Sequence, residues 1–127
     1  MLDGRRTGLH IRNLTRGSVL ADRAEVADTS RKRRVGLLKH DSLPSGQGLW
    51  IIPCEGVHTF GMKFPIDVVF LDRAKKVLKI RAGMGPRRIS LCLRAHSVLE
   101  LPAGTAAAAQ TQPGDQLEFS EADAGAP

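Results

Sequence analysis

The chain has 127 residues, of which 42% are hydrophobic and 25% are charged, a composition typical of one soluble domain with its own core. One Trp, four Phe and no Tyr leave few rings to stack on bases or sugars, which argues against single-stranded nucleic acid or carbohydrate as the main ligand. The net charge of +6 is uneven: residues 1–39 carry ten Lys or Arg and four Asp or Glu, whereas residues 40–127 carry nine of each.

The N-terminal third predicts two or three strands followed by a helix. The alternation of LHIRN at 9–13 is typical of a half-buried strand, and the segment 18–28 supplies one or two more. The hydrophobic period then changes, and Thr29 or Ser30 can act as the N-cap of a short helix over residues 30–39.

The rest of the chain predicts strands separated by turns. PIDVVFLD at 65–72 is the clearest strand, and apolar side chains on both of its faces indicate burial on both sides. Residues 72–76 connect it to a return strand over 77–81, as in a hairpin. Further short strands, bounded by Gly or Pro, are predicted at 48–53, 97–102 and 115–119.

Seven or eight short strands with one helix predict a mainly β fold, a single-domain β-sandwich or barrel. The domain is expected to span residues 9–119, with flexible termini at 1–8 and 120–127. Neither a signal peptide nor a window of 18 apolar residues is present, so we expect a cytoplasmic protein that does not bind membranes. In that reducing compartment the two cysteines are expected to be free thiols.

A family resemblance rests on four segments: ADTSRKRRVGLL at 27–38, HTFGMKFPIDVVFLD at 58–72, VLELPAG at 98–104 and QPGDQLEF at 112–119. In this order they are similar to the bacterial and archaeal family called domain of unknown function 192. The resemblance implies a sandwich or jelly-roll-like barrel with one short helix, and it implies no reaction. Many members carry an export signal or lipid anchor, whereas this chain resembles a cytoplasmic branch with FGMKFP at 60–65.

Two Cys-x3-His pairs raise the question of a metal. Cys54 with His58 and Cys92 with His96 would satisfy a tetrahedral zinc site in the number and softness of its ligands. In an extended strand, residues i and i+4 lie about 13 Å apart, so each pair converges only if the chain turns within it. Cys54 and Cys92 can also form a disulfide or a reversible redox pair, or pack as small hydrophobic residues. We expect no cofactor, and zinc is the alternative.

Three polar residues, His58, Asp67 and Glu100, interrupt apolar stretches that are expected to be half-buried. A buried carboxylate is costly unless it is paired, and the partner of Asp67 can be His58 or backbone N–H groups in the FPI turn at 64–66. A His–carboxylate pair can do acid–base chemistry, but it is also an ordinary way to satisfy a buried Asp. We therefore expect a non-catalytic binding or accessory module with a polar pocket. The expected walls of this pocket are Trp50, Phe60 and Met62.

Two alternative functions remain. A metal- or thiol-dependent enzyme would use the two Cys-x3-His pairs described above. A nucleic-acid binder would need the basic run RKRR at 31–34 to form one patch with other N-terminal arginines; such a run is more often the solvated face of a short helix. The arginines concerned are Arg5, Arg6, Arg12 and Arg16. The favoured partner is therefore an unknown small molecule or protein, bound by a monomer or homodimer.

Overall fold

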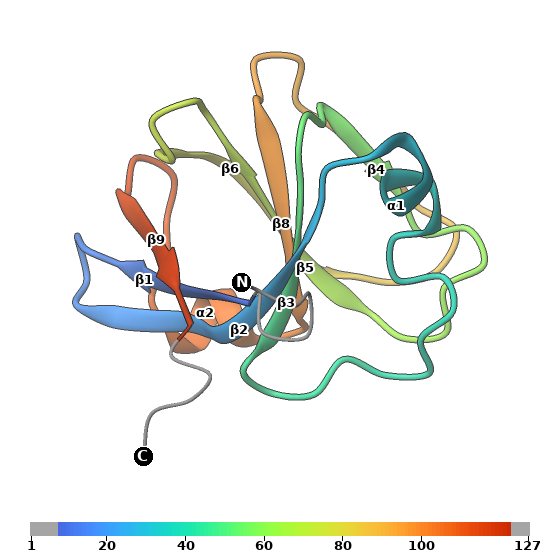
Figure 1. Ribbon diagram of the computed structural model, residues 1–127, viewed down its shortest axis with the longest axis horizontal. Coiled ribbons are helices and arrows are strands. Elements are labelled where there is room, and N and C mark those ends of the chain that lie inside the picture. The colour runs from blue at the N-terminus through green and yellow to red at the C-terminus, as the bar shows by residue number, and fades with distance from the viewer. Residues whose placement is uncertain (1–7, 123–127) are drawn as a thin grey trace, which may run out of the picture.

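The prediction of a mainly β fold is confirmed by a computed structural model that describes residues 8–122 (Figure 1). Seven strands form one sheet in the order β6-β5-β8-β3-β2-β1-β9, and β4 and β7 form a separate two-stranded sheet. The elements are β1 (Leu9–Asn13), β2 (Ser18–Ala27), α1 (Ser30–Val35), β3 (Gln47–Ile51), β4 (Gly56–His58), β5 (Ile66–Leu71), β6 (Val77–Met84), β7 (Ile89–Leu91), β8 (Ser97–Pro102), α2 (Thr105–Ala108) and β9 (Leu117–Glu121).

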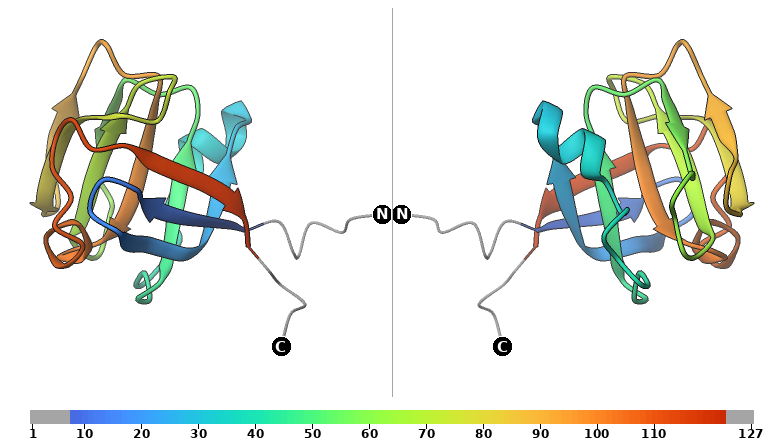
Figure 2. Two further views of the ribbon diagram at one scale, coloured as in Figure 1. Left: turned by 90° about the vertical axis from the view of Figure 1, so that its left-hand side faces the viewer. Right: turned by 90° about the vertical axis from the view of Figure 1, so that its right-hand side faces the viewer.

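The seven-stranded sheet curls until its two outermost strands meet at one end. There the backbone of Lys76 forms a β-bridge with that of Gln116, and the N–H of Val77 donates to the carbonyl of Asp115 at 2.8 Å. Figure 2 shows the curl from two sides, with β9 bending over the open side of the sheet. The result is a half-barrel. In the part of the chain that the structure describes, neither helix is long and apolar enough to cross a lipid bilayer.

The central strands separate two hydrophobic cores. Side chains alternate along a strand, so Val69 and Leu71 of β5 point into the curl, while Val68 and Phe70 point to its outer side. The inner core is enclosed by β1, β2 and β9, and the outer core is covered by β4 and the loops around it. All six residues of β5 are buried, which confirms the predicted burial on both sides.

The predicted helix begins where expected and is shorter than expected. The side chain of Thr29 accepts a hydrogen bond from the N–H of Lys32 at 3.1 Å, as an N-cap does. The helix ends at Val35, because Gly36 has φ 48 and ψ −127, outside the helical region. The helix α2 and the strands β4 and β7 were not predicted, since three or four residues are too few to show a hydrophobic period.

The domain reaches slightly beyond the predicted boundaries of 9–119. The last strand, β9, continues to Glu121, and the N–H of Ala122 donates to the carbonyl of Gly8 at 2.9 Å. Residues 120 and 121 therefore belong to the sheet and not to a flexible terminus. The remaining parts of the predicted flexible termini, 1–7 and 123–127, lie outside the described residues.

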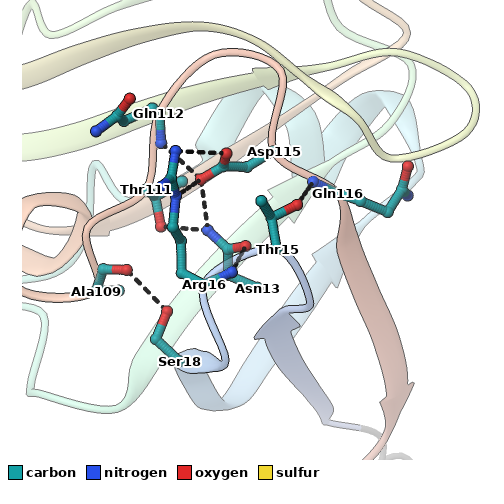
Figure 3. A network of polar contacts seen from close by, with 9 residues as sticks. All are labelled: Asn13, Thr15, Arg16, Ser18, Ala109, Thr111, Gln112, Asp115 and Gln116. Carbon is teal, nitrogen blue, oxygen red and sulfur yellow. Dashed lines mark hydrogen bonds and ion pairs between the residues drawn. The ribbon is translucent and has the colours of Figure 1, made fainter.

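A buried polar network ties the β1–β2 turn to the loop before β9 (Figure 3). Asp115 is 2% exposed, and its carboxylate accepts hydrogen bonds from Asn13 Nδ2 at 3.0 Å, Arg16 Nε at 2.9 Å and the N–H of Gln112 at 3.0 Å. Asn13 also donates to the hydroxyl of Thr111 at 3.0 Å. Burial opposes ionisation of Asp115, but the hydrogen bonds from Arg16, Asn13 and Gln112 outweigh it and lower the pKa of Asp115. This carboxylate stabilises the closure of the half-barrel.

Candidate functional site

Glu100 lines a cleft of about 480 Å³ between α1 and the outer side of the sheet. On β8 it lies directly opposite Val68 of β5 and Leu49 of β3, on the face that carries the outer core. Glu100 is 5% exposed. Among residues 8–122, burial is the one cause that shifts its pKa, and neither a hydrogen bond nor a neighbouring charge contributes. The other lining residues are Ser30, Arg33, Arg34, Val35, Gly36, Leu37, Leu38, Ile51, Pro53, Cys54, Glu55, Gly56, Val57, His58 and Met62.

Burial changes the protonation of two groups in this cleft. It raises the pKa of Glu100 to about 7, so that near neutral pH this residue is divided between its acid and its carboxylate forms. Burial also raises the pKa of the Cys54 thiol, which donates a hydrogen bond to the carbonyl of Gly56 at 3.1 Å. The nearby charge of Glu100 raises that pKa further. A protonated thiol is a poor nucleophile, so the surroundings of Cys54 do not favour thiol catalysis.

The HTFGM segment forms a turn that is held by a buried threonine. The hydroxyl of Thr59 donates to the carbonyl of Gly85 at 2.6 Å and accepts from the N–H of Arg88 at 2.9 Å. Gly61 has φ +85, a conformation that favours glycine, and the chain then returns Met62 to the protein, where it is 8% exposed. Thr59 and Gly61 thereby position Met62 at the cleft.

The aromatic residues of the same segment are more exposed. The N–H of Phe60 donates to Nδ1 of His58 at 3.3 Å, and the centroids of the two rings lie 5.7 Å apart. His58 is exposed and lines the cleft, whereas Phe60 is 48% exposed and does not line it. His58 is therefore an exposed side chain in the lining of the cleft.

The helix α1 brings arginines to the opposite wall. None of its six residues is buried. The guanidinium of Arg33 donates to the carbonyl of Ile52 at 3.3 Å and to the hydroxyl of Ser30 at 3.4 Å, and Arg34 is exposed. The cleft thus has a buried carboxyl group on one wall and positive charge on the other.

Asp67 lies on the other face of the sheet from Glu100. It is fully buried, and its two oxygens accept hydrogen bonds from the N–H groups of Gly83 at 2.8 Å, Gly104 at 3.1 Å and Ala106 at 2.9 Å. Backbone groups are therefore its partners, but they belong to β6 and to the start of α2 and not to the FPI turn, and the alternative pairing with His58 is not formed. Asp67 fixes the start of α2 against β6.

Trp50 also lies on the inner side, so the predicted pocket needs correction. Its ring makes an edge-on contact with Phe119, with centroids 4.7 Å apart, and the ammonium of Lys75 lies 5.3 Å from the Trp50 centroid. Of the six residues predicted for one pocket, the structure brings three to the cleft and leaves three away from it. Those at the cleft are His58, Met62 and Glu100; those away from it are Trp50, Phe60 and Asp67.

The two Cys-x3-His pairs do not converge. Within residues 8–122, no three Cys, His, Asp or Glu side chains are grouped so that they could hold a metal ion. Cys54 and Cys92 are free thiols, each half-buried against the outer core, and their N–H groups donate to the carbonyls of His96 and Glu55. Within the described residues, the structure does not group Cys54, His58, Cys92 and His96 as the four ligands that a zinc site would need.

The predicted basic patch is divided between two regions. Arg12 forms an ion pair with Glu118 at 3.7 Å, and Arg16 is bound to Asp115 in the buried network. Both arise from the β1 region, on the opposite side of the domain from α1 (Figure 1). Arg5 and Arg6 lie outside the described residues. Arg12 and Arg16 therefore do not extend the basic surface of α1.

The fold and the cleft define a small half-barrel protein whose buried Glu100 carboxyl group has no partner among residues 8–122. The chain belongs to the family DUF192, described as "Uncharacterized ACR", whose model matches residues 11–119. The predicted family resemblance is confirmed.

Relatives and solved structures agree with this membership. A UPF0127 protein of Thermococcus sibiricus is 29% identical over 112 residues, covering 84% of this chain and 72% of the relative. The UPF0127 protein TK1120 of Thermococcus kodakarensis is 25% identical over 113 residues, covering 85% and 71%. The names of the family and of these relatives indicate no catalytic activity.

Two crystal structures have a similar fold. A protein of unknown function from Novosphingobium aromaticivorans has a TM-score of 0.76 at 23% identity, covering 87% of this chain and 83% of its own. A protein from Sinorhizobium meliloti, described as a candidate transcription regulator, has a TM-score of 0.79 at 21% identity, covering 94% and 97%. At these identities the likeness shows the shared fold.

Proposed function

We propose that this chain is a ligand-binding protein and that the Glu100 cleft is its binding site. One observation carries the proposal: Glu100 is 5% exposed and lines the cleft, and among the described residues neither a hydrogen bond nor a neighbouring charge contributes to its pKa. An unpaired buried polar group costs free energy, and a ligand that donates a hydrogen bond to it removes that cost. A cavity of about 480 Å³ lies in the usual size range of small-molecule sites.

The charges around the cleft favour a small molecule with two different ends. Glu100 would accept a hydrogen bond from an ammonium or another donor group. Arg34, exposed on the wall that α1 forms, would bind an anionic group. Ile51, Val57 and Met62 supply apolar surface to the cleft. The ligand class that these residues support is a small zwitterion, such as an amino acid or a close derivative.

The pKa of Glu100 gives the proposal a pH signature. A cationic group binds the carboxylate form, which rises from roughly a tenth of the molecules at pH 6 to nine tenths at pH 8 for a pKa of about 7. Apparent affinity for an amine-bearing ligand should therefore increase about tenfold over this interval. Binding should also release a proton near neutral pH.

The test is a screen of amino acids, amines and carboxylic acids by thermal shift, followed by titration calorimetry of each compound that binds. We expect Glu100→Gln to weaken binding at least about tenfold and to remove its pH dependence. Glu118→Gln is the matched control, because Glu118 is half exposed on β9, away from the cleft. The proposal fails if the wild type binds no compound of these classes, or if Glu100→Gln binds as tightly as the wild type.

We further propose that the protein acts in the cytoplasm, where thiols stay reduced. This is supported by Cys54 and Cys92, which are both unbridged. The test is to trap thiols in intact cells with a maleimide reagent before lysis. Two modified cysteines per chain without prior reduction are expected, and oxidised cysteines would contradict the proposal.

A further inference from the structure

A second basic region lies outside the N-terminal third. Residues 73–96 contain eight Lys or Arg and no Asp or Glu, a bias that disappears when residues 40–127 are counted together. The same segment carries three exposed aliphatic side chains: Ile89 is 60%, Leu91 is 56% and Leu93 is 74% exposed. Exposed aliphatic residues gathered in one segment commonly mark an interaction surface.

The strand β7 presents two of these residues, Ile89 and Leu91, at a sheet edge. It pairs with β4 on one side, with Ser90 opposite Val57, and it has no strand neighbour on its other side among residues 8–122. Ser90 is buried, so Ile89 and Leu91, one position away on either side, both point outward. At this outer edge the carbonyl of Leu91 accepts a hydrogen bond from the Lys79 ammonium at 2.7 Å.

Exposed guanidinium groups flank the apolar side chains along the chain. Arg87 and Arg88 precede Ile89, and Arg94 follows Leu93; all three arginines are exposed. With the aliphatic residues they form what we call the β7 surface: Arg87, Arg88, Ile89, Leu91, Leu93 and Arg94. It combines apolar contact area, positive charge and an open strand edge.

We propose that the β7 surface binds an extended segment of another protein, one in which acidic and aliphatic residues alternate. Such a segment would pair its backbone with the outer edge of β7 and would replace the Lys79 ammonium at the carbonyl of Leu91. Its aliphatic side chains would cover Ile89 and Leu91, and its carboxylates would bind the flanking arginines and Lys79. The surface is separate from the Glu100 cleft, so this inference does not depend on the proposed ligand.

The composition of the β7 surface disfavours three other binding partners: a second copy of this chain, nucleic acid and a lipid bilayer. A second copy of this chain would bring the arginines of both β7 surfaces together with no acidic residue from 73–96 to pair with them. Exposed aliphatic side chains without aromatic rings suit nucleic acid poorly. Insertion into a bilayer would leave the backbone groups of the open strand edge without partners in hydrocarbon.

The experiment selects peptides from a displayed library of random nine-residue sequences on the intact protein. Selected peptides are then made synthetically, labelled, and titrated by fluorescence anisotropy at about 50 mM and about 300 mM salt. We expect enrichment of alternating acidic and aliphatic sequences whose affinity falls with added salt. The double substitution Ile89→Ser with Leu91→Ser should weaken binding at least tenfold, and Arg88→Gln with Arg94→Gln about as much.

The matched control is Leu14→Ser with Val19→Ser, which removes two aliphatic side chains of similar exposure, 46% and 47%, from the β1–β2 region. It should leave affinity unchanged. The proposal is overturned if no sequence class is enriched, if the β7 variants bind as the control does, or if vesicles of anionic phospholipid bind the protein through this surface in place of peptide.

Discussion

Two buried carboxyl groups in different regions of the domain show how differently the same chemistry can be used. At the closure of the half-barrel, Asp115 receives hydrogen bonds from two side chains and from the backbone, and its pKa is lowered. In the outer cleft, Glu100 has no partner in the described part of the chain, and burial raises its pKa to about 7. A carboxylate whose hydrogen bonds are satisfied within the protein stabilises the fold, whereas a carboxylate without such partners is available to bind a ligand.

Asp67 belongs with Asp115 in this comparison. Three backbone N–H groups surround it, and it holds α2 against β6. Its position next to HTFGM in the sequence is therefore a poor guide to its role. Hydrogen-bond partners, and not proximity in the chain, distinguish the structural carboxylates from the candidate binding residue.

Asp115→Ala should give the largest change. It removes charge-assisted hydrogen bonds and leaves the buried Asn13 amide without this acceptor, so the free energy of unfolding should fall by about 4 kcal/mol. Urea denaturation at neutral pH measures this. Asp41→Ala is the control, since Asp41 forms an exposed ion pair with Lys63 and no measurable change is expected. Equal losses of stability in the two variants would mean that the buried Asp115 network contributes no more to the free energy of unfolding than an exposed ion pair does.

Glu100→Gln should act in the opposite direction, and only at high pH. The folded-state pKa of about 7 lies above the ordinary value of 4.5, so wild-type stability falls as pH rises between these values and then levels off. Gln carries no charge to bury, so the variant should gain up to about 3 kcal/mol over the wild type at pH 8. At pH 4 the two proteins should differ little. Urea denaturation at both pH values measures the difference in the free energy of unfolding between the two proteins. A difference that does not change with pH would contradict a raised pKa of Glu100.

Cys54 should report the charge of Glu100 directly. Because that charge contributes to the raised pKa of the thiol, Glu100→Gln should speed alkylation of Cys54 by iodoacetamide about threefold at pH 8. The rate is measured by mass spectrometry in a Cys92→Ser background. Alkylation of the urea-unfolded chain serves as the reference for an unshielded thiol. An unchanged rate would mean that the two groups are not electrostatically coupled.

Glu118→Ala should give the smallest change. Its ion pair with Arg12 is long, at 3.7 Å, and the two side chains are 50% and 45% exposed. Solvent screens such a pair, so the free energy of unfolding should change by less than about 0.5 kcal/mol. Thermal denaturation of this variant beside Asp115→Ala compares an exposed and a buried ion pair within one small region. A loss of stability approaching that of Asp115→Ala would show that solvent exposure does not predict how much these ion pairs stabilise the protein.

Local sequence patterns predicted most of the secondary structure. Alternating residues marked the strand at 9–13, and an apolar run bounded by turn residues marked the strand at 97–102; the structure reproduces both boundaries as β1 and β8. The two candidate N-caps, Thr29 and Ser30, marked the start of α1, and apolar residues on both faces of 65–72 marked a strand buried on both sides. These features depend on residues a few positions apart, so the sequence contains them directly.

The basic character of the β7 surface is also present in the sequence, as a local bias within a longer neutral segment. Residues 73–96 are strongly basic, while 40–127 as a whole are neutral. The three-residue strand β7, which places Ile89 and Leu91 outward, was too short to predict. Its existence depends on pairing with β4, more than thirty residues earlier in the chain.

The composition of the cleft was decided by tertiary structure alone. In the β5–β8 pair, Asp67 lies opposite Leu101 and Glu100 lies opposite Val68, so the two acids differ by one position in register. Because side chains alternate, that single step sends Asp67 to the inner face and Glu100 to the outer face. The sequence by itself determined that both acids interrupt buried strands. Which one faces a cleft was determined by the register between strands about thirty residues apart, which only long-range packing can select.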